Sequence, residues 1–552
     1  MLAVVLLNQA TDLIGTLERR FYDIASTSTS RQPSDRIAII AIDDQSIANI
    51  GRWPWPRDIH AKLIDQLAAA KAKTIVHTAF FFEPQVDPGL IFIRKIKSLL
   101  RPGEAGSDQA ASSAELNRVI AQAESALDTD AVLAASMTKA GNVLVPSVFS
   151  LGEPQGNPDK PLPAYALKSA ISEKSGFSYP AVSGQQPIEA IGVAAAGIGH
   201  LNQFRDEDGA VRQEPLLVNY YGNAVPSMAL LAAIKSLNLA SADVKLNTGE
   251  SVQIGKLRVK TDESALMLPQ FYKDRDGRPP FVIDSFYDVL NGKIPASKYA
   301  EKIVIIGATA AGVGVSFPVP GHAGLSPAET IAHITSSILS EHFIVQPGWG
   351  VWVAFAVFLL IAAYVIALLP RLSAGKAAIL TLVLFMAMLA AEFGLLSGGA
   401  TWVKLVLPVV LLSIGHLGLT TKRFLMTERG KEKSDEESAE TNRMMGLALQ
   451  GQGQLDMAFD RFRRVPMGDA VMGNLYNLAL DFERKRQFNK AEAVYQHMAT
   501  YDKDYKDLQS KLNRAKNLSE TVMLGGGGAH PGGDHAARRW LGGEADAWPL
   551  SG

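Results

Sequence analysis

The chain has 552 residues, of which 47% are hydrophobic, and this length exceeds what a single hydrophobic core organises. Its 54 Lys and Arg nearly balance its 55 Asp and Glu, which argues against a nucleic-acid-binding protein. The sequence contains no cysteine, which excludes disulfides, thiolate metal sites, iron–sulfur clusters and a cysteine nucleophile.

The first thirty residues carry an incomplete membrane signal. The apolar run MLAVVLL is too short to span a bilayer and lacks the basic start of a signal peptide. We expect residues 1–30 to be an N-terminal segment whose apolar start is the end of a longer transmembrane helix encoded from an earlier start. The alternative is that later apolar helices direct export.

Residues 31–345 have the pattern of an α/β domain. Arg36–Ile42 and Lys302–Ile306 are short β-branched runs, typical of strands that are buried on both faces. His60–Ala72 has apolar residues at helical spacing, and Thr74–Val76 begins another strand. The order strand, helix, strand predicts a crossover unit with parallel strands.

Two segments within this region interrupt the pattern. Gly103–Ser136 is rich in Ala, Ser, Glu and Asp, which predicts a helical insertion with a mobile start. Phe177–Pro187 is rich in turn-forming residues and is expected to connect elements.

Three apolar stretches follow, at residues 350–369, 377–396 and 402–420. Each is long enough to cross about 30 Å of hydrocarbon at about 1.5 Å per residue, so we predict three transmembrane helices. Buried helices of a large soluble core are the alternative, but three in tandem with short polar connections favour the membrane.

The basic residues beside these stretches predict their orientation. Arg371 and Lys376 lie in the first connection, and Lys422 and Arg423 directly follow the third stretch. Because Lys and Arg accumulate on the cytoplasmic side, we expect residues 1–345 outside the cytoplasm and residues 422–552 inside it.

Two ionisable residues fall inside the apolar stretches. Glu392 and Lys404 are expected near the outer ends of adjacent helices, and one interpretation is that they pair across the short second connection. The favoured interpretation is that each side chain extends separately to the interface.

The last part of the chain is predicted to be helical. Residues 422–443 read as a charged linker, and residues 444–518 repeat themselves: one constant offset superposes Ala458 on Ala491 and Phe462 on Tyr495. This spacing resembles the tetratricopeptide repeat (TPR), although an ordinary helical hairpin remains the alternative. Residues 519–552 are glycine-rich and are expected to be disordered.

One group of candidate ligand-binding residues follows the first strand. Asp43 and Asp44 end that strand, and ligands of open α/β sheets gather at the carboxyl ends of strands. The planar donors and aromatic rings that follow suit an anionic or ring-bearing ligand. They are Arg52, Trp53, Trp55, Arg57 and His60. The alternative is a rigid connection whose tryptophans fill the core and whose arginine pairs with Asp43 or Asp44.

A second candidate group lies between residues 200 and 212. His200, Asp206, Asp208 and Arg212 are assigned here to ligand binding. Carboxylates spaced two apart beside a glycine also suggest a calcium loop, but the closing bidentate carboxylate is missing and Asp-Gly is a common hairpin turn. We therefore predict no metal site and no cofactor.

Four motifs in this order resemble the CHASE2 extracytoplasmic sensor domain of bacterial receptors. They are IIAIDDQSIANIGRWPWPR (Ile39–Arg57), FFFEP (Phe80–Pro84), GIGHLNQFRDEDGAVRQEPLL (Gly197–Leu217) and KIVIIGATAAG (Lys302–Gly312). Thr78 stands where the family commonly has an Asp. The resemblance implies an α/β sensor domain over about residues 31–340, closed by three transmembrane helices and followed by a cytoplasmic kinase or cyclase.

The kinase motifs of the family's commonest members are not found in the sequence, so we expect a non-enzymatic protein, a Ser/Thr kinase receptor truncated before its kinase. The expected architecture is an α/β extracytoplasmic sensor domain, three helices in a bacterial inner membrane and a cytoplasmic all-α, TPR-like region. The expected partners are the lipid bilayer, an unknown extracytoplasmic ligand and a cytoplasmic protein, with no nucleic acid and a homodimer left open. The alternative function is a membrane scaffold that recruits proteins through the repeats.

Overall fold

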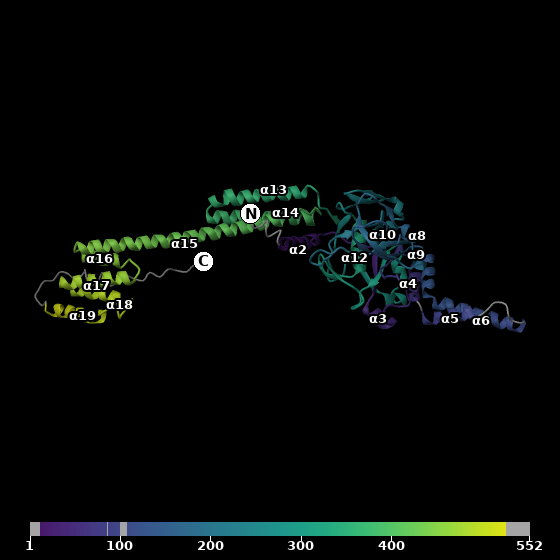
Figure 1. Cartoon of the computed structure of the whole chain (residues 1–552), viewed down its shortest axis with the longest axis horizontal. Helices are drawn as coiled ribbons and strands as arrows, with labels where there is room; N and C mark the ends of the chain where they lie inside the picture. Colours follow the sequence, from purple (N-terminus) through teal and green to yellow (C-terminus); the bar gives the residue numbers. More distant parts are fainter. Residues whose placement is uncertain (1–10, 86, 100–106, 526–552) are drawn as a thin grey trace. The chain divides into compact units, whose positions relative to one another are not determined.

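The computed structural model describes residues 11–85, 87–99 and 107–525 (Figure 1). The chain divides into two compact units, Met1–Leu417 and Gly418–Gly552. The apolar start of the predicted N-terminal segment and most of the predicted disordered tail lie outside the described residues.

A mixed β-sheet forms the centre of the first unit, and the predicted strands are part of it. Its parallel strands are β14 (Val282–Ser285), β1 (Ile37–Ile42), β15 (Ile303–Ala308), β2 (Thr74–His77), β3 (Val143–Leu151) and β6 (Gly197–His200). The sheet continues from β3 through β5 (Tyr179–Gln185), β8 (Leu217–Tyr220), β9 (Asn223–Pro226) and β4 (Ile171–Ser172). The strand predicted from Lys302 lies between β1 and β2, because Ile305 pairs with both Ile39 and Val76.

Helices cover both faces of this sheet, which explains the unbroken apolar runs in its central strands. Ile39 and Ile305 face one core, whereas Ile40 and Ile306 face the other. The first core is closed by α10 (Met228–Ser236) and α12 (Pro327–Leu339). The second is closed by α3 (Asp44–Ile50), α4 (Arg57–Ala69), α7 (Thr129–Ala140), α8 (Ala164–Leu167), α9 (Glu189–Ala194) and α11 (Phe286–Leu290).

The segment Phe177–Pro187, predicted to be turns, is largely a strand. Residues Tyr179–Gln185 form β5, in which Gly184 pairs with Phe149 of β3 and Tyr179 pairs with Val218 of β8. Its Ser, Gly and Pro content favours turns locally, but backbone partners on both sides satisfy its hydrogen bonds and override that preference.

The predicted insertion is helical. α5 (Pro88–Leu99) and α6 (Ser107–Leu127) pack as a hairpin and lead into α7 (Figure 1). The start of the insertion, residues 103–106, lies outside the described residues.

Smaller sheets and one N-terminal helix complete the unit. The sheets are β10–β11–β12 (Val244–Asn247, Ser251–Ile254, Leu257–Lys260), β18–β13–β7 (Phe343–Ile344, Leu266–Pro269, Glu214–Pro215) and β16–β17 (Phe317–Val319, His322–Leu325). The helix α2 (Leu13–Thr27) belongs to the segment predicted as residues 1–30.

Within the described residues, three helices are long and apolar enough to cross a membrane, by length and composition. They are α13 (Gly350–Ala363) with its continuation to Arg371, α14 (Ala374–Ser397) and α15 (Val406–Gly451). The third helix starts later than predicted: residues 402–405 lie outside any helix, and the Trp402 backbone N–H donates to the Val345 carbonyl at 2.9 Å. Pro408 explains this start, because proline is tolerated only in the first turn of a helix.

A polar chain connects these three helices to one another. The Tyr364 hydroxyl, at the end of the first, lies 2.9 Å from Oγ1 of Thr381 in α14, which lies 2.9 Å from Nδ1 of His416 in α15. Such contacts are favourable between apolar helices because the polar groups otherwise lack partners.

The charged stretch at residues 422–443, predicted as a linker, is part of α15. It is rich in Glu, Lys and Arg, which favour helix, and it extends a helix that is already nucleated.

The second unit then continues as α16 (Leu455–Phe462), α17 (Asp469–Arg484), α18 (Phe488–Ala499) and α19 (Leu508–Gly525). The two superposed pairs, Ala458 with Ala491 and Phe462 with Tyr495, are buried in one core. Residues 519–525, predicted as the start of the disordered tail, belong to α19.

Candidate functional site

A cavity of about 780 Å³ opens beside the carboxyl end of β2 and the start of α4. Its walls come from the Trp53–Arg57 loop, the start of α4, residues 79–85 after β2, residues 160–163, and the end of β5 with the residues that follow it. This is the edge of an open α/β sheet at which ligands collect. Four of the predicted site residues line it: Trp53, Trp55, Arg57 and His60.

Arg57 is 7% exposed and is fully engaged with protein groups. Its guanidinium donates to the carboxylate of Asp130 and to the backbone carbonyl of Glu83. Asp130 also accepts from the backbone N–H of Gln85 at 3.0 Å. The Arg57–Asp130 pair therefore neutralises both charges and fixes the loop after β2. Arg57 does not form the predicted pair with Asp43 or Asp44, because its partner is Asp130.

The two tryptophans differ in their surroundings. Trp55 is 2% exposed, and its indole N–H donates to the carbonyl of Gly51 at 2.8 Å. Trp53 is half-buried and meets Trp55 edge to face, with ring centroids 5.2 Å apart. Trp55 thus fills the core, while Trp53 presents part of its ring to the cavity.

Two buried histidines contact each other here, and one of them, His60, lines the cavity. Nδ1 of His60 lies 3.1 Å from Nε2 of His77, and Nδ1 of His77 accepts from the backbone N–H of Ala79 at 3.1 Å. Burial lowers the pKa of His60 to about 4 and holds the pKa of His77 well below its usual value. Both imidazoles are therefore neutral at physiological pH. His77 belongs to no recognisable sequence motif, so its contact with His60 could not be predicted from the sequence.

Asp43, Asp44 and Arg52 lie apart from the cavity lining. Asp43 caps α3, accepting from Ser46 N–H at 2.8 Å and from the Ser285 hydroxyl at 3.0 Å. Asp44 accepts from the backbone N–H of Ala311 at 3.1 Å, and Arg52 is exposed. The strand end that the sequence predicted is correct, but its carboxylates hold the backbone together.

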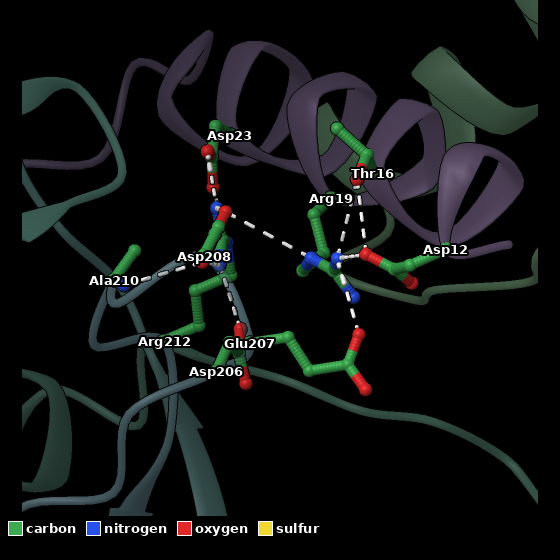
Figure 2. Close-up of polar contacts among 9 residues, drawn as sticks. All are labelled: Asp12, Thr16, Arg19, Asp23, Asp206, Glu207, Asp208, Ala210 and Arg212. Atoms are coloured by element: carbon green, nitrogen blue, oxygen red, sulfur yellow. Dashed lines mark hydrogen bonds and ion pairs between the residues drawn. The ribbon is translucent and has the colours of Figure 1, made fainter.

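The second predicted group contains an ion network centred on Arg212 (Figure 2). Arg212 is 3% exposed and donates to Asp206 at 2.7 Å and to Asp208 at 2.8 and 2.9 Å. It also binds Asp23 of α2 through two parallel hydrogen bonds of 2.7 and 2.8 Å. Arg19 of α2 extends the network to Asp12, Glu207 and Asp208.

This network is structural in form. The Asp206 N–H donates to the Ala210 carbonyl at 2.9 Å across a turn in which Gly209 adopts a φ of 80°, as the hairpin alternative predicted. Arg212 lowers the pKa of Asp208 to about 2. No group of three or more His, Asp or Glu among the described residues is arranged to hold a metal ion.

His200 is the remaining member of the second group. It is buried at the end of β6, where its Nδ1 accepts from the backbone N–H of Asn202 at 3.3 Å, and burial lowers its pKa to about 3. Within the described part of the chain, no hydrogen bond or ion pair joins it to the Arg212 network.

The helix α2 contacts the residues at the start of α15 as well as the Arg212 network. Glu18 accepts from the indole N–H of Trp402 at 2.9 Å and from the backbone N–H of Val406 at 3.3 Å. Tyr22 packs on Trp402 with ring centroids 4.4 Å apart. One helix therefore links the loop at Arg212 to the start of α15.

Glu392 and Lys404 have separate neighbours, and no ion pair joins them in the described structure. Glu392 is fully buried and accepts from the backbone N–H of Leu405 at 3.3 Å, whereas the Lys404 ammonium lies 4.6 Å from the centre of the Trp402 ring. Glu392 therefore contacts the backbone of Leu405, whereas Lys404 lies over the Trp402 ring.

Comparison with known proteins supports the resemblance noted in the sequence. No curated protein and no solved structure matches the chain. Residues 1–369 match the family model of the CHASE2 domain. Because this match covers more than half of the chain, the protein belongs to the CHASE2 domain family.

Proposed function

We propose that the protein is a membrane receptor whose α/β domain detects an extracytoplasmic ligand and transmits the signal through its apolar helices. The observation that carries this proposal is the CHASE2 domain together with three helices long enough to cross a membrane. A CHASE2 domain suggests a sensory role. The length and apolar composition of the three helices are compatible with insertion into a membrane.

The cavity beside the end of β2 and the start of α4 is the ligand site in this proposal. Its volume lies within the range of about 300–1,000 Å³ that is usual for small-molecule sites. Its walls combine the Trp53–Arg57 loop with the loop after β2. Those loops are joined directly, because the Arg57 guanidinium donates to the Glu83 carbonyl and the Arg57 N–H donates to the Gln85 side chain at 2.8 Å, so a ligand that displaces one loop also displaces the other.

The route from this domain to the membrane is α2. Arg212 holds Asp23 near one end of the helix, and the Gln270 side chain donates to the Ser26 carbonyl at 2.7 Å. On the helix's membrane-side face, Glu18 holds the Trp402 indole and the start of α15. Transmission requires that the ligand bind two positions of α2 with different affinities.

The membrane orientation follows the basic flanks. Arg371 and Lys376 would lie in the cytoplasm, and Trp349 and Trp352, which are 56% and 73% exposed, would lie at the outer interface. In this arrangement residues 1–345 are extracytoplasmic and residues 422–552 are cytoplasmic, in the inner membrane of a bacterium.

The output is protein binding by the helical region, without an enzymatic reaction of its own. The hairpin α17–α18 and the end of α15 with α16 repeat the same small and aromatic core positions, which supports a TPR-like surface for a partner protein. A membrane scaffold that recruits partners without sensing is the competing function.

Deuterium exchange on the full chain in lipid nanodiscs separates receptor from scaffold. The probe is the low-molecular-mass fraction of a bacterial periplasmic extract. A receptor gains protection at residues 53–60 and 79–85 and changes its exchange rate in α2. A scaffold shows the same exchange with and without the extract, and that result would contradict the proposal.

A further inference from the structure

The histidine pair fixes a hydrogen-bond donor in the cavity wall. Because Nδ1 of His77 accepts from Ala79 N–H, the neutral ring of His77 carries its proton on Nε2 and donates it to Nδ1 of His60. The network therefore assigns the proton of neutral His60 to Nε2. His60 lines the cavity, and the hydrogen bonds of the described residues include no acceptor for this N–H.

A second polar group of the cavity wall lacks partners. Both amide atoms of Gln186 are buried without a hydrogen bond to any described residue. Gln186 lines the same cavity as His60. Unsatisfied buried amides destabilise a fold, so a carbonyl and an N–H2 left open beside a cavity indicate a ligand that both donates and accepts.

Aromatic faces supply the apolar part of the wall. Phe80 is 51% exposed and stacks on Phe82, with ring centroids 4.9 Å apart, and Trp53 is half-buried next to them in the lining. Such rings offer flat, weakly negative faces to the C–H groups of a bound ring.

The buried part of the cavity has no unpaired charge among the described residues. Arg57 is neutralised by Asp130, and both histidines are neutral. The remaining charged lining residues, Glu83 and Lys160, are exposed. An ionic ligand at the floor would lose its hydration without gaining a counter-charge, whereas an uncharged one pays no such penalty.

We propose that this cavity binds an uncharged mono- or disaccharide, the ligand class of the receptor function proposed above, on which this inference rests. Sugar hydroxyls accept from the His60 Nε2–H and exchange hydrogen bonds with the Gln186 amide. The C–H face of the sugar ring packs on Phe80 and Trp53. This chemistry replaces the anionic ligand suggested by Arg52 and Arg57, since neither arginine is available at the cavity floor.

The test measures binding of four uncharged sugars to the full chain in nanodiscs. The probes are glucose, N-acetylglucosamine, maltose and chitobiose, and binding is followed by isothermal titration calorimetry and by the tryptophan fluorescence of the chain. At least one is expected to bind, and Gln186→Leu weakens it roughly tenfold or more because both amide contacts are lost. Gln253→Leu on β11, whose side chain contacts the Gly255 carbonyl, is the matched control and leaves affinity unchanged.

Misfolding cannot imitate this result. Gln186→Leu removes a buried amide that has no protein partner, so its thermal midpoint is expected to equal or exceed that of the unmodified chain. If none of the four sugars binds, or if Gln186→Leu binds as well as the control, the saccharide assignment is overturned.

Two further arms separate this failure from failure of the receptor function. Binding of glutamate or arginine at the cavity instead of a sugar overturns the ligand class but leaves sensing intact. The variant Ala79→Trp fills the cavity, and an unchanged deuterium-exchange response of this variant to the periplasmic extract overturns the cavity as the ligand site and the saccharide assignment with it, while sensing itself stands. Absence of a response in the unmodified chain overturns the receptor function.

Discussion

Removal of the Arg212 guanidinium tests how α2 is held to the sensor domain. Arg212 is 3% exposed and donates five hydrogen bonds, to Asp23, Asp206 and Asp208. Arg212→Ala leaves these three carboxylates facing one another beside Glu207 of the same loop. Their like charges and lost partners are expected to destabilise the fold and to detach α2 from the loop.

The size of the effect follows from burial. Breaking a buried ion pair by removing one partner costs about 3–5 kcal/mol. The side chains of Asp23, Asp206 and Asp208 are 27%, 29% and 33% exposed. Water therefore solvates them in the variant and compensates part of the lost interaction energy. We expect a decrease of about 2–3 kcal/mol in the free energy of unfolding of the first unit.

The assay is urea unfolding of the full chain in detergent micelles, followed by tryptophan fluorescence, with deuterium exchange of α2 as a second readout. Arg258→Ala is the matched control, because Arg258 is 53% exposed and pairs with Glu250, which is 69% exposed. The control is expected to cost less than about 1 kcal/mol. Equal stability of the two variants, with unchanged exchange in α2, would refute the role assigned to Arg212.

The remaining predictions concern pH. Burial raises the pKa of Glu214 to about 8, so the folded state binds a proton that the unfolded state releases, and stability falls as pH rises from about 4.5 to 8. Glu214→Gln should remove this slope and add on the order of 3 kcal/mol at pH 7; an unchanged slope would contradict the assignment. His60 titrates in the opposite sense: its folded pKa of about 4 lies below the unfolded value of 6.5, so stability is lost as pH falls between these values. In urea unfolding between pH 4 and 7, the double variant His60→Gln/His77→Gln should lose less stability on acidification than the unmodified chain. An equally steep loss of stability would exclude the histidine pair as its cause.

The sequence predicts elements whose residues repeat a local period. The strands at Ile37–Ile42 and Ile303–Ala308, the helix after His60 and the three apolar helices all follow from runs or spacings within one segment. The strand β5 was missed because its residues favour turns and only its neighbours in the sheet stabilise it. The helical form of residues 422–443 was missed because charge density was read as a linker.

The candidate site was predictable only in part. Trp53, Trp55, Arg57 and His60 occur in one short motif, and that motif does line the cavity. Their partners come from distant positions that carry no local signal. Asp130 is separated from Arg57 by 73 residues, and Asp23 is separated from Arg212 by 189. Whether the Arg57 charge is available to a ligand depends on these partners. The sequence alone therefore suggests an anionic ligand, whereas in the fold Arg57 is paired and the neutral His60 lines the cavity.

The central claim is that the sensor domain and the helical region lie on opposite sides of a membrane. Because the chain contains no cysteine, single cysteines can be introduced at the exposed positions Ser297 and Ser434 without a background signal. Labelling of intact spheroplasts with a membrane-impermeant maleimide should modify Ser297→Cys directly and Ser434→Cys only after the membrane is permeabilised. Modification of Ser434→Cys in intact spheroplasts, with Ser297→Cys protected until permeabilisation, would contradict the orientation and the receptor function built on it.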